Sequence, residues 1–253
     1  MKTSELITRR RMIITGISSV GGLLLTGCSS KKLPPSYGNI LRMGDTLTYA
    51  AHQTLLPGQK LVKEYTHRDI SSFPATGTTN PGDPNLRNSN EAYRNLHGGG
   101  FADWRLSIEG LVAKPGLYSL ADLKRFPSRT QITKHTCEEG WSAIAQWTGV
   151  PLSRVLDDAG LLPSARFVSF YSYDEWADCI DMLDALHPQT ILAYGMNGRD
   201  LPLPHGAPVR LRVETQLGYK SMKYLQRIVV REEFDDGGKN GSIQSGWSWY
   251  AGI

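Results

Sequence analysis

Apolar and polar residues alternate in several short segments between residues 104 and 231, with the two-residue period of a β-strand. In Trp104–Val112 the alternation predicts a strand with one buried face. The pair Asn197-Gly198 is a strong signal for a hairpin turn between two such segments. The pattern predicts strands at residues 104–112, 129–135, 166–172, 190–196, 208–213 and 225–231.

Two helices are indicated by their end signals. Ser119 is followed three residues later by Asp122, a capping signature that predicts a short helix over residues 119–126. A second helix is predicted to end near His97, where the chain enters Gly98-Gly99-Gly100. Both helices lie close in sequence to predicted strands.

Other segments are less regular. A helix is predicted to open within Trp147–Leu152, with Pro151 near its first turn, where a missing backbone N–H has no cost. Residues 45–53 fit either a short helix or a strand. Residues 29–89 as a whole are rich in loop-forming residues, so we expect a tether and an extended N-terminal segment there.

The first 28 residues have the pattern of an export signal. Arg9-Arg10 precedes an apolar stretch over residues 12–25, an arrangement typical of twin-arginine signals. This stretch is short and interrupted by glycines, and an uncleaved N-terminal anchor is the alternative. It ends at Cys28 in a sequence typical of lipoprotein cleavage sites. We expect a twin-arginine lipoprotein signal at residues 1–28, lipidation of Cys28, and a membrane-anchored protein on the periplasmic or cell-surface side.

Composition narrows the possible partners. The net charge of +4 is small for 253 residues and comes partly from the signal, so nucleic acid is not an expected partner. The sequence contains no phosphate-cradling Gly-rich loop, no zinc-like Cys/His spacing and no C-x-x-C-H haem motif. We expect a catalytic domain at residues 90–231 and a tail at 232–253. The tail's aromatic residues are expected to close over the body or to line the substrate entrance: Trp247, Trp249 and Tyr250.

Cys137 is the residue with the strongest claim to chemistry. It follows the predicted strand 129–135 and precedes a turn with Gly140. A cysteine in this position suits a metal ligand or a nucleophile, and the alternative is a small buried apolar residue. For Cys179 three interpretations are open: a buried structural thiol, which we favour, a disulfide with Cys137, or a second redox group. Metal binding by Cys137 would exclude the disulfide.

The string C-E-E-G-W-S from Cys137, followed by W-T-G-V-P-L from Trp147, resembles the molybdenum-ligating segment of the sulfite oxidase superfamily. It is most similar to the small bacterial branch that includes the catalytic subunit of periplasmic methionine sulfoxide reductase. The resemblance implies a mixed, β-rich α+β domain. It also implies that the Cys137 thiolate binds molybdenum, since a soft thiolate suits a metal already held by the dithiolene sulfurs of molybdopterin.

The same resemblance assigns further residues to the cofactor. Asn90, Tyr93 and Arg94 match a segment that contacts the pterin, and an Arg and a Lys further on suit the terminal phosphate. The alternative for such basic residues is a solvated surface position. Because these basic residues are few, the nucleotide-free form of molybdopterin is expected. The complete expected set is Asn90, Tyr93, Arg94, His97, Cys137, Ser172, His205, Arg210, Ser221 and Lys223.

The reaction implied is two-electron redox chemistry of the oxygen-atom transfer type on a small oxo-compound, such as sulfite or a sulfoxide. Electrons are expected to pass to or from an external protein, either a haem membrane subunit or a cytochrome. The chain departs from the bacterial reductases, with His205 where they have asparagine and Ser221 where they have glycine, so the substrate stays open. The alternative is a lipid-anchored binding module that keeps the fold without the metal.

Overall fold

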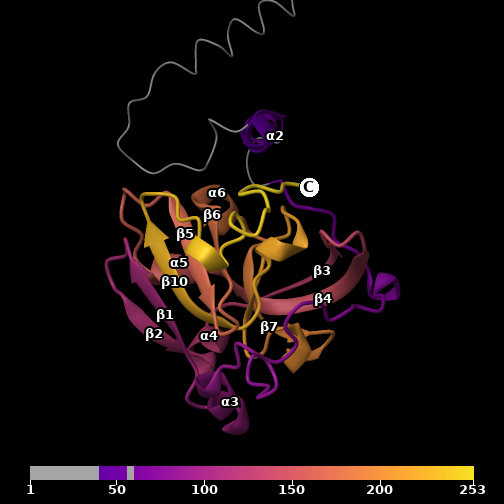
Figure 1. Cartoon of the computed structure of the whole chain (residues 1–253), viewed down its shortest axis with the longest axis vertical. Helices are drawn as coiled ribbons and strands as arrows, with labels where there is room; N and C mark the ends of the chain where they lie inside the picture. Colours follow the sequence, from indigo (N-terminus) through magenta and orange to yellow (C-terminus); the bar gives the residue numbers. More distant parts are fainter. Residues whose placement is uncertain (1–39, 56–59) are drawn as a thin grey trace, which may run out of the picture. The chain divides into compact units, whose positions relative to one another are not determined.

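The computed structural model of the protein describes residues 40–55 and 60–253, which contain two β-sheets (Figure 1). The expected signal at residues 1–28, with Cys28, lies outside the described residues, as does part of the expected tether. Along the chain, short helices are interspersed with the strands of both sheets. The expected mixed, β-rich α+β fold is confirmed.

The first sheet has five strands in the order β2-β1-β10-β5-β6. Strands β1 and β10 pair in parallel, and the other neighbours are antiparallel. Leu106 and Ile108 of β1 are fully buried while their neighbours are half-buried or exposed, as the alternation predicts. The bounds are β1 Arg105–Gly110, β2 Gly116–Ser119, β5 Phe167–Ser172, β6 Ala177–Asp181 and β10 Leu225–Arg231.

The second sheet has the order β3-β4-β7-β8, with β9 paired to β7. Thr136, the last residue of β3, pairs with Ser142, the first residue of β4. The chain between them is therefore a tight turn, and this turn carries Cys137. The bounds are β3 Arg129–Thr136, β4 Ser142–Pro151, β7 Ile191–Met196, β8 Arg199–Asp200 and β9 Arg210–Arg212.

The helices begin where side chains cap their first turns. The side chain of Asn90 accepts the backbone N–H of Tyr93 at the start of α3, and Ser119 and Asp122 form a complete capping box at α4. Both predicted helices are confirmed, and α2 resolves the open choice at residues 45–53 as a helix. The bounds are α2 Ile40–Leu55, α3 Glu91–Gly98, α4 Leu120–Arg125, α5 Leu152–Ala159, α6 Met182–Ala185, and the 3-10 turns η1 His67–Asp69, η2 Leu203–His205, η3 Gly218–Lys220 and η4 Gly238–Asn240.

The helix predicted to open within Trp147–Leu152 begins later than expected. The segment from Trp147 to Val150 belongs to β4, and α5 begins at Leu152, directly after Pro151. Strand β4 pairs along its length with β3 and at this end also with β7, so the pairing between strands outweighs the local helix signal. At Gly149 the backbone of β7 approaches so closely that a Cβ atom would overlap Leu192.

Strand β6 is an element that the sequence pattern does not predict. Its five residues are all buried, so the alternation that marks strands such as β1 is absent. It contains Cys179, which is free and buried. The interpretation of Cys179 as a buried thiol is confirmed, and the alternative of a disulfide with Cys137 is wrong.

The C-terminal tail divides its aromatic residues between two places. Trp249 and Tyr250 are buried in a small cluster, where both rings lie about 5 Å from the ring of Tyr49 in α2. Trp247 instead stacks on Tyr219, with 5.4 Å between ring centroids, and lines a cavity. Trp249 and Tyr250 therefore pack against the body, which is the first of the two expectations for the tail. Trp247 instead lies at the cavity.

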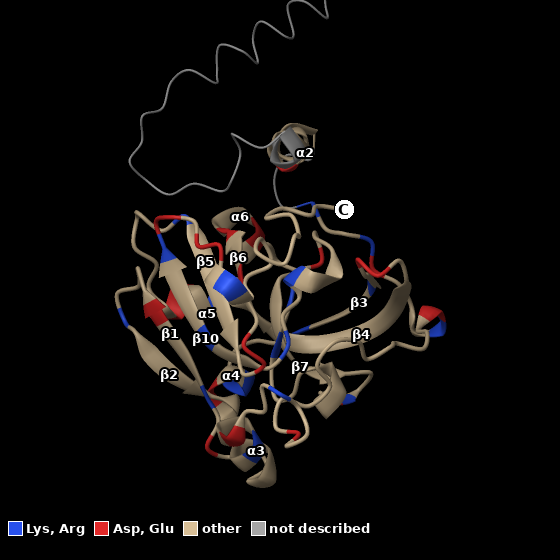
Figure 2. Ribbon diagram, in the orientation of Figure 1, with Lys and Arg blue, Asp and Glu red and all other residues tan. Residues whose placement is uncertain are grey.

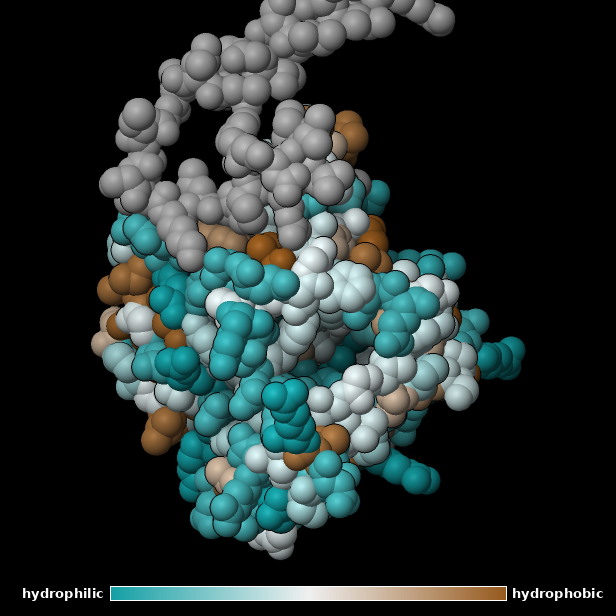
Figure 3. All heavy atoms as spheres, viewed as in Figure 1, coloured by the Kyte–Doolittle hydropathy of each residue, from teal (hydrophilic) through white to brown (hydrophobic). Residues whose placement is uncertain are grey.

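Charged and hydrophobic residues are mixed on the part of the surface that the figures show. Basic and acidic residues both occur along the strands and loops of the two sheets (Figure 2). On the face drawn in Figure 3, hydrophobic residues form separate small groups rather than one continuous patch. No helix in the described part of the chain has the length and apolar character needed to span a membrane. The chemistry is better sought in a cavity than on an exposed face.

Candidate active site

A cavity of about 300 Å³ lies next to the turn between β3 and β4. Segments far apart in sequence line it, including residues 73–78, the Cys137 turn and the region around η3. The structure brings together here half of the residues expected at the cofactor: Cys137, His205, Arg210, Ser221 and Lys223.

The turn that carries Cys137 is closed by two backbone hydrogen bonds. The Cys137 N–H donates to the carbonyl of Trp141 at 2.9 Å, and the Gly140 N–H donates to the carbonyl of Cys137 at 3.1 Å. Gly140 has a φ of 89°, a left-handed conformation that favours glycine. The turn thereby holds the thiol at the cavity, with only 6% of the residue exposed.

Two carboxylates lie beside the thiol. The Sγ atom of Cys137 is 3.5 Å from Oε2 of Glu138 and 3.8 Å from Oε2 of Glu139. Burial, with a smaller contribution from these carboxylates, raises the pKa of the Cys137 thiol to about 11. A thiolate at neutral pH therefore needs a cation at the sulfur, and a bound metal ion supplies that charge.

The positively charged side chain of Arg210 also lines the cavity, and the residue is only 4% exposed. Its Nη1 donates to the carbonyl of His205 at 3.1 Å and its Nη2 to the carbonyl of Ser221 at 2.7 Å, while its buried Nε has no hydrogen-bond partner. Burial and the nearby Arg212 lower the pKa of Arg210 to about 9. A buried N–H without an acceptor costs about 1–3 kcal/mol, which an oxygen of an anionic ligand would recover.

Lys223 has a different set of contacts. Its ammonium donates to the carbonyls of Thr76 at 2.8 Å and Pro204 at 3.3 Å, and also to the carbonyl of Thr78. Its three N–H groups are thus directed at backbone oxygens, two of them in the segment that lines the cavity. Lys223 holds residues 73–78 against the cavity in this structure, and burial lowers its pKa to about 8.

We expect Lys223→Met to raise the rate of proteinase K cleavage within residues 73–78 by about tenfold or more in metal-free protein, because each charge-assisted hydrogen bond contributes about 1.5–3 kcal/mol. Lys134→Met, at an exposed position of β3, is the matched control and should leave the rate unchanged. Equal cleavage of the Lys223 variant and the unmodified protein would show that Lys223 does not hold this segment.

The other expected residues do not line the cavity. Asn90 donates to the carbonyl of Tyr173 at 3.0 Å, and the hydroxyl of the fully buried Tyr93 donates to the carbonyl of Ala207 at 2.6 Å. The Tyr93 bond connects α3 to the chain just after His205, and the Asn90 bond connects the start of α3 to the residue before the cavity residue Asp174. Both bonds therefore act on the cavity through the backbone. Ser172 lies below the surface, with its Oγ 2.5 Å from Oδ1 of Asp174, a cavity residue.

Two basic residues of α3 lie at the surface. Arg94 donates from Nε to the carbonyl of Gly82 at 2.7 Å and from Nη2 to the hydroxyl of Ser89 at 2.8 Å. His97 is exposed, with its ring 5.6 Å from that of Phe101. Neither is among the residues that line the cavity, and their assignment to the cofactor stays a prediction.

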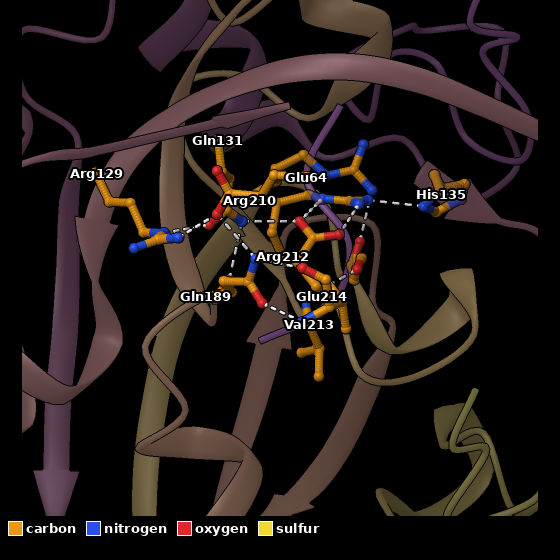
Figure 4. Close-up of polar contacts among 11 residues, drawn as sticks. Glu64, Arg129, Gln131, His135, Gln189, Arg210, Arg212, Val213 and Glu214 are labelled. Atoms are coloured by element: carbon orange, nitrogen blue, oxygen red, sulfur yellow. Dashed lines mark hydrogen bonds and ion pairs between the residues drawn. The ribbon is translucent and has the colours of Figure 1, made fainter. Parts of the chain in front are cut away.

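A buried polar network supports the cavity wall, and sequence reasoning missed it (Figure 4). Arg212 forms a two-bond ion pair with Glu214, at 3.1 and 2.8 Å, and both side chains are 1% exposed. Arg212 also lies 2.7 Å from Nδ1 of His135 and 4.5 Å over the ring of Trp147. In the period-two string R-L-R-V-E from Arg210, two arginines lie on one face of β9 and Glu214 follows just beyond its end, and this signal could have found the network.

His135 connects this network to the cavity. It lines the cavity, and burial together with Arg212 and Arg210 lowers its pKa to about 2, so the imidazole is neutral. A Cβ atom on Gly218 would overlap the His135 ring. Only glycine at this position lets η3 lie against the β3 strand, which closes the cavity on that side.

A comparison with known families identifies the domain. Residues 97–238 match the family model described as the oxidoreductase molybdopterin binding domain. The chain belongs to this family. The expected relation to the sulfite oxidase superfamily and the expected molybdopterin cofactor are thereby confirmed.

Two curated proteins are similar over part of their length. A protein of Azospira oryzae, named as a protein-methionine-sulfoxide reductase subunit (YedZ1), is 39% identical over 151 residues, which are 60% of this chain and 56% of that protein. The protein-methionine-sulfoxide reductase catalytic subunit MsrP of Ralstonia nicotianae is 35% identical over 141 residues, which are 49% of this chain and 43% of that protein. The chain matches about half the length of each relative.

A solved structure also resembles part of the chain. The crystal structure of the sulfane dehydrogenase SoxCD from Paracoccus pantotrophus has 28% sequence identity and a TM-score of 0.49, over 52% of this chain and 39% of that chain.

The residues at the cavity fit a molybdopterin cofactor. The Cys137 thiol is the soft donor that such a metal accepts, and it needs a bound cation to become a thiolate. The buried Nε of Arg210 lacks an acceptor, which an anionic group of the cofactor would supply. These two features lie at one cavity although 73 positions separate them in the sequence.

Proposed function

We propose that the protein is a molybdenum-dependent oxidoreductase that carries out two-electron, oxygen-atom transfer chemistry on a small oxo-compound, with Cys137 as the protein ligand to the metal. The observation that carries the proposal is the Cys137 thiol at a cavity that is also lined by Arg210, whose buried Nε has no hydrogen-bond partner. The names of the two curated relatives favour a sulfoxide over sulfite as the substrate.

Each part of the cavity has a distinct role in this proposal. When bound, the molybdenum centre supplies two-electron redox chemistry and oxygen-atom exchange. Arg210 binds the phosphate of the cofactor, Cys137 holds the metal, and Lys223 keeps residues 73–78 in place so that water is excluded. Reduction of a sulfoxide consumes two electrons and two protons, breaks the S–O bond and yields a sulfide and water. The electrons would come from an external haem membrane subunit or a cytochrome.

The cofactor form follows from the small number of basic groups. Among the described residues that line the cavity, the cationic side chains are Arg210 and Lys223, and Lys223 is directed at backbone carbonyls. One guanidinium suits a single terminal phosphate, so we infer the nucleotide-free form of molybdopterin. Arg210→Ala should lower the molybdenum content of purified protein more than the turnover of its loaded fraction. Release of a nucleotide on acid treatment would contradict this inference.

Metal analysis with an activity assay tests the proposed function. Protein matured in cells that make the cofactor should contain close to one molybdenum atom per chain and should reduce dimethyl sulfoxide with reduced viologen as the electron donor. The competing function is a lipid-anchored binding module without metal. Correctly matured protein that contains no molybdenum would support that module and reject the enzyme.

We propose further that the protein is exported by the twin-arginine pathway and anchored through Cys28, because that pathway carries folded proteins and suits a cofactor loaded in the cytoplasm. Replacing both Arg9 and Arg10 with lysine should hold the protein in the cytoplasm. Cys28→Ala should leave export intact and release the protein from the membrane fraction. Normal export of the double-lysine variant in cell fractionation would reject the twin-arginine route.

A further inference from the structure

Acidic groups gather beside the expected metal ligand. Glu138 and Glu139 both line the cavity, with carboxylate oxygens 3.5 and 3.8 Å from the Sγ atom of Cys137. Glu139 is held in place by the indole N–H of Trp141, which donates to its Oε2 at 2.9 Å. The hydrogen bond described for Glu138 is the one from the Cys137 thiol. Among the described residues no ion pair is formed by Glu138, so its carboxylate lies at the cavity without a cationic partner.

The basic groups of the cavity are already engaged. Both Nη atoms of Arg210 donate to backbone carbonyls, and its remaining Nε is the group that the proposed function assigns to the cofactor. Lys223 directs its ammonium at three carbonyls. Burial, with Arg210 and Lys223 nearby, lowers the pKa of His205 to about 4, so this side chain is neutral. An incoming anion would therefore find carboxylates beside Cys137, while the N–H groups of the cationic lining residues Arg210 and Lys223 are directed at carbonyls or assigned to the cofactor.

We propose that Glu138 selects substrates by charge, favouring oxo-compounds that are neutral or carry a cationic group over anionic ones such as sulfite. This inference rests on the proposed function. The carboxylate of Glu138 repels an anion before the oxygen atom to be transferred can reach the metal, and it attracts a cationic group on the same molecule. The substrate class is then a sulfoxide with an amine or another basic group close to the sulfur.

A matched substrate pair tests the selection. The methyl ester of methionine sulfoxide is a cation and N-acetyl-methionine sulfoxide is an anion, while the sulfoxide group is the same. With full-length, molybdenum-loaded protein and reduced viologen, we expect kcat/KM for the ester to exceed that for the acetyl compound by on the order of tenfold. Added salt should reduce this ratio, because it screens charges near the cavity mouth.

Variants assign the effect to one residue. Glu138→Gln should lower the ratio of the two kcat/KM values several-fold toward one, although Glu139 remains at the cavity. Glu138→Asp, which keeps the charge, should restore most of the preference. The matched control is Glu175→Gln, an exposed carboxylate that follows the cavity residue Asp174 but does not line the cavity. It should leave the ratio unchanged. Rates are divided by molybdenum content, so incomplete loading does not enter the ratio.

The outcomes separate this inference from the proposed function. Loaded protein that reduces neither dimethyl sulfoxide nor the charged pair would reject the proposed function, and with it the selection by charge. Loaded protein that reduces dimethyl sulfoxide but treats the charged pair equally would reject only the selection. An undiminished preference in Glu138→Gln would also overturn the role of Glu138, because the ratio is measured within each protein and does not depend on how much of the variant is folded.

Discussion

Replacing Cys137 with serine is expected to lower turnover by about a thousandfold or more, equivalent to at least about 4 kcal/mol of transition-state stabilisation. A serine hydroxyl is a hard, weakly acidic donor and cannot replace a soft thiolate as a ligand to this metal. The change is nearly isosteric, so the turn closed by Trp141 and Gly140 should persist. The measurement is viologen-dependent sulfoxide reduction per molecule of folded protein.

Cys179→Ser is the matched control for this prediction. Cys179 is 1% exposed in β6 and packs with Phe234, so the substitution places a hydroxyl in an apolar cluster and costs some stability. It does not touch the cavity, and turnover per bound molybdenum should stay within about threefold of the unmodified protein. An active Cys137 variant together with an inactive Cys179 variant would reverse the assignment.

The second large effect is expected at Arg212. Arg212→Met leaves the carboxylate of Glu214 buried at 1% exposure without its ion-pair partner, and losing one member of a buried pair typically costs about 3–5 kcal/mol. Gln131, which donates to Oε1 of Glu214 at 3.0 Å, compensates only part of that charge. The free energy of unfolding, measured by denaturant titration of metal-free protein, should fall by this amount.

Arg227→Met is the control for the burial argument. Its ion pair with Glu109 has an N–O distance of 3.5 Å, and both side chains are about two-fifths exposed. Solvent screens such a pair, so its loss should cost less than about 1 kcal/mol. Similar losses for the Arg212 and Arg227 variants would show that the network behind the cavity does not stabilise the fold as the burial suggests.

The strands of the fold could be predicted because one-sided burial leaves a visible alternation, as at Leu106 and Ile108 in β1. Where burial is two-sided, as in β6, no alternation exists and the strand was missed. The local signal at Pro151 predicts a helix that opens earlier, because it cannot reveal that this end of β4 pairs with β7 as well as β3. Strand β7 lies far from β4 in the sequence.

The chemical roles of single site residues could be predicted from the sequence, but the segments that come together at the cavity could not. Cys137 and Arg210 are residue types whose roles can be proposed from the sequence, and the structure places both at one cavity. The segment 73–78 carries no motif, and it reaches the cavity only through contacts such as those of Lys223. The bonds of Arg94 to Gly82 and Ser89 likewise depend on the folded chain and could not be read from the motif.

The central claim is that the Cys137 sulfur binds molybdenum, and X-ray absorption at the molybdenum edge tests it most directly. The spectrum of the loaded protein should require one more sulfur neighbour than the spectrum of loaded Cys137→Ser, while Cys179→Ser should match the unmodified protein. An identical number of sulfur neighbours in the unmodified protein and the Cys137 variant would contradict the account.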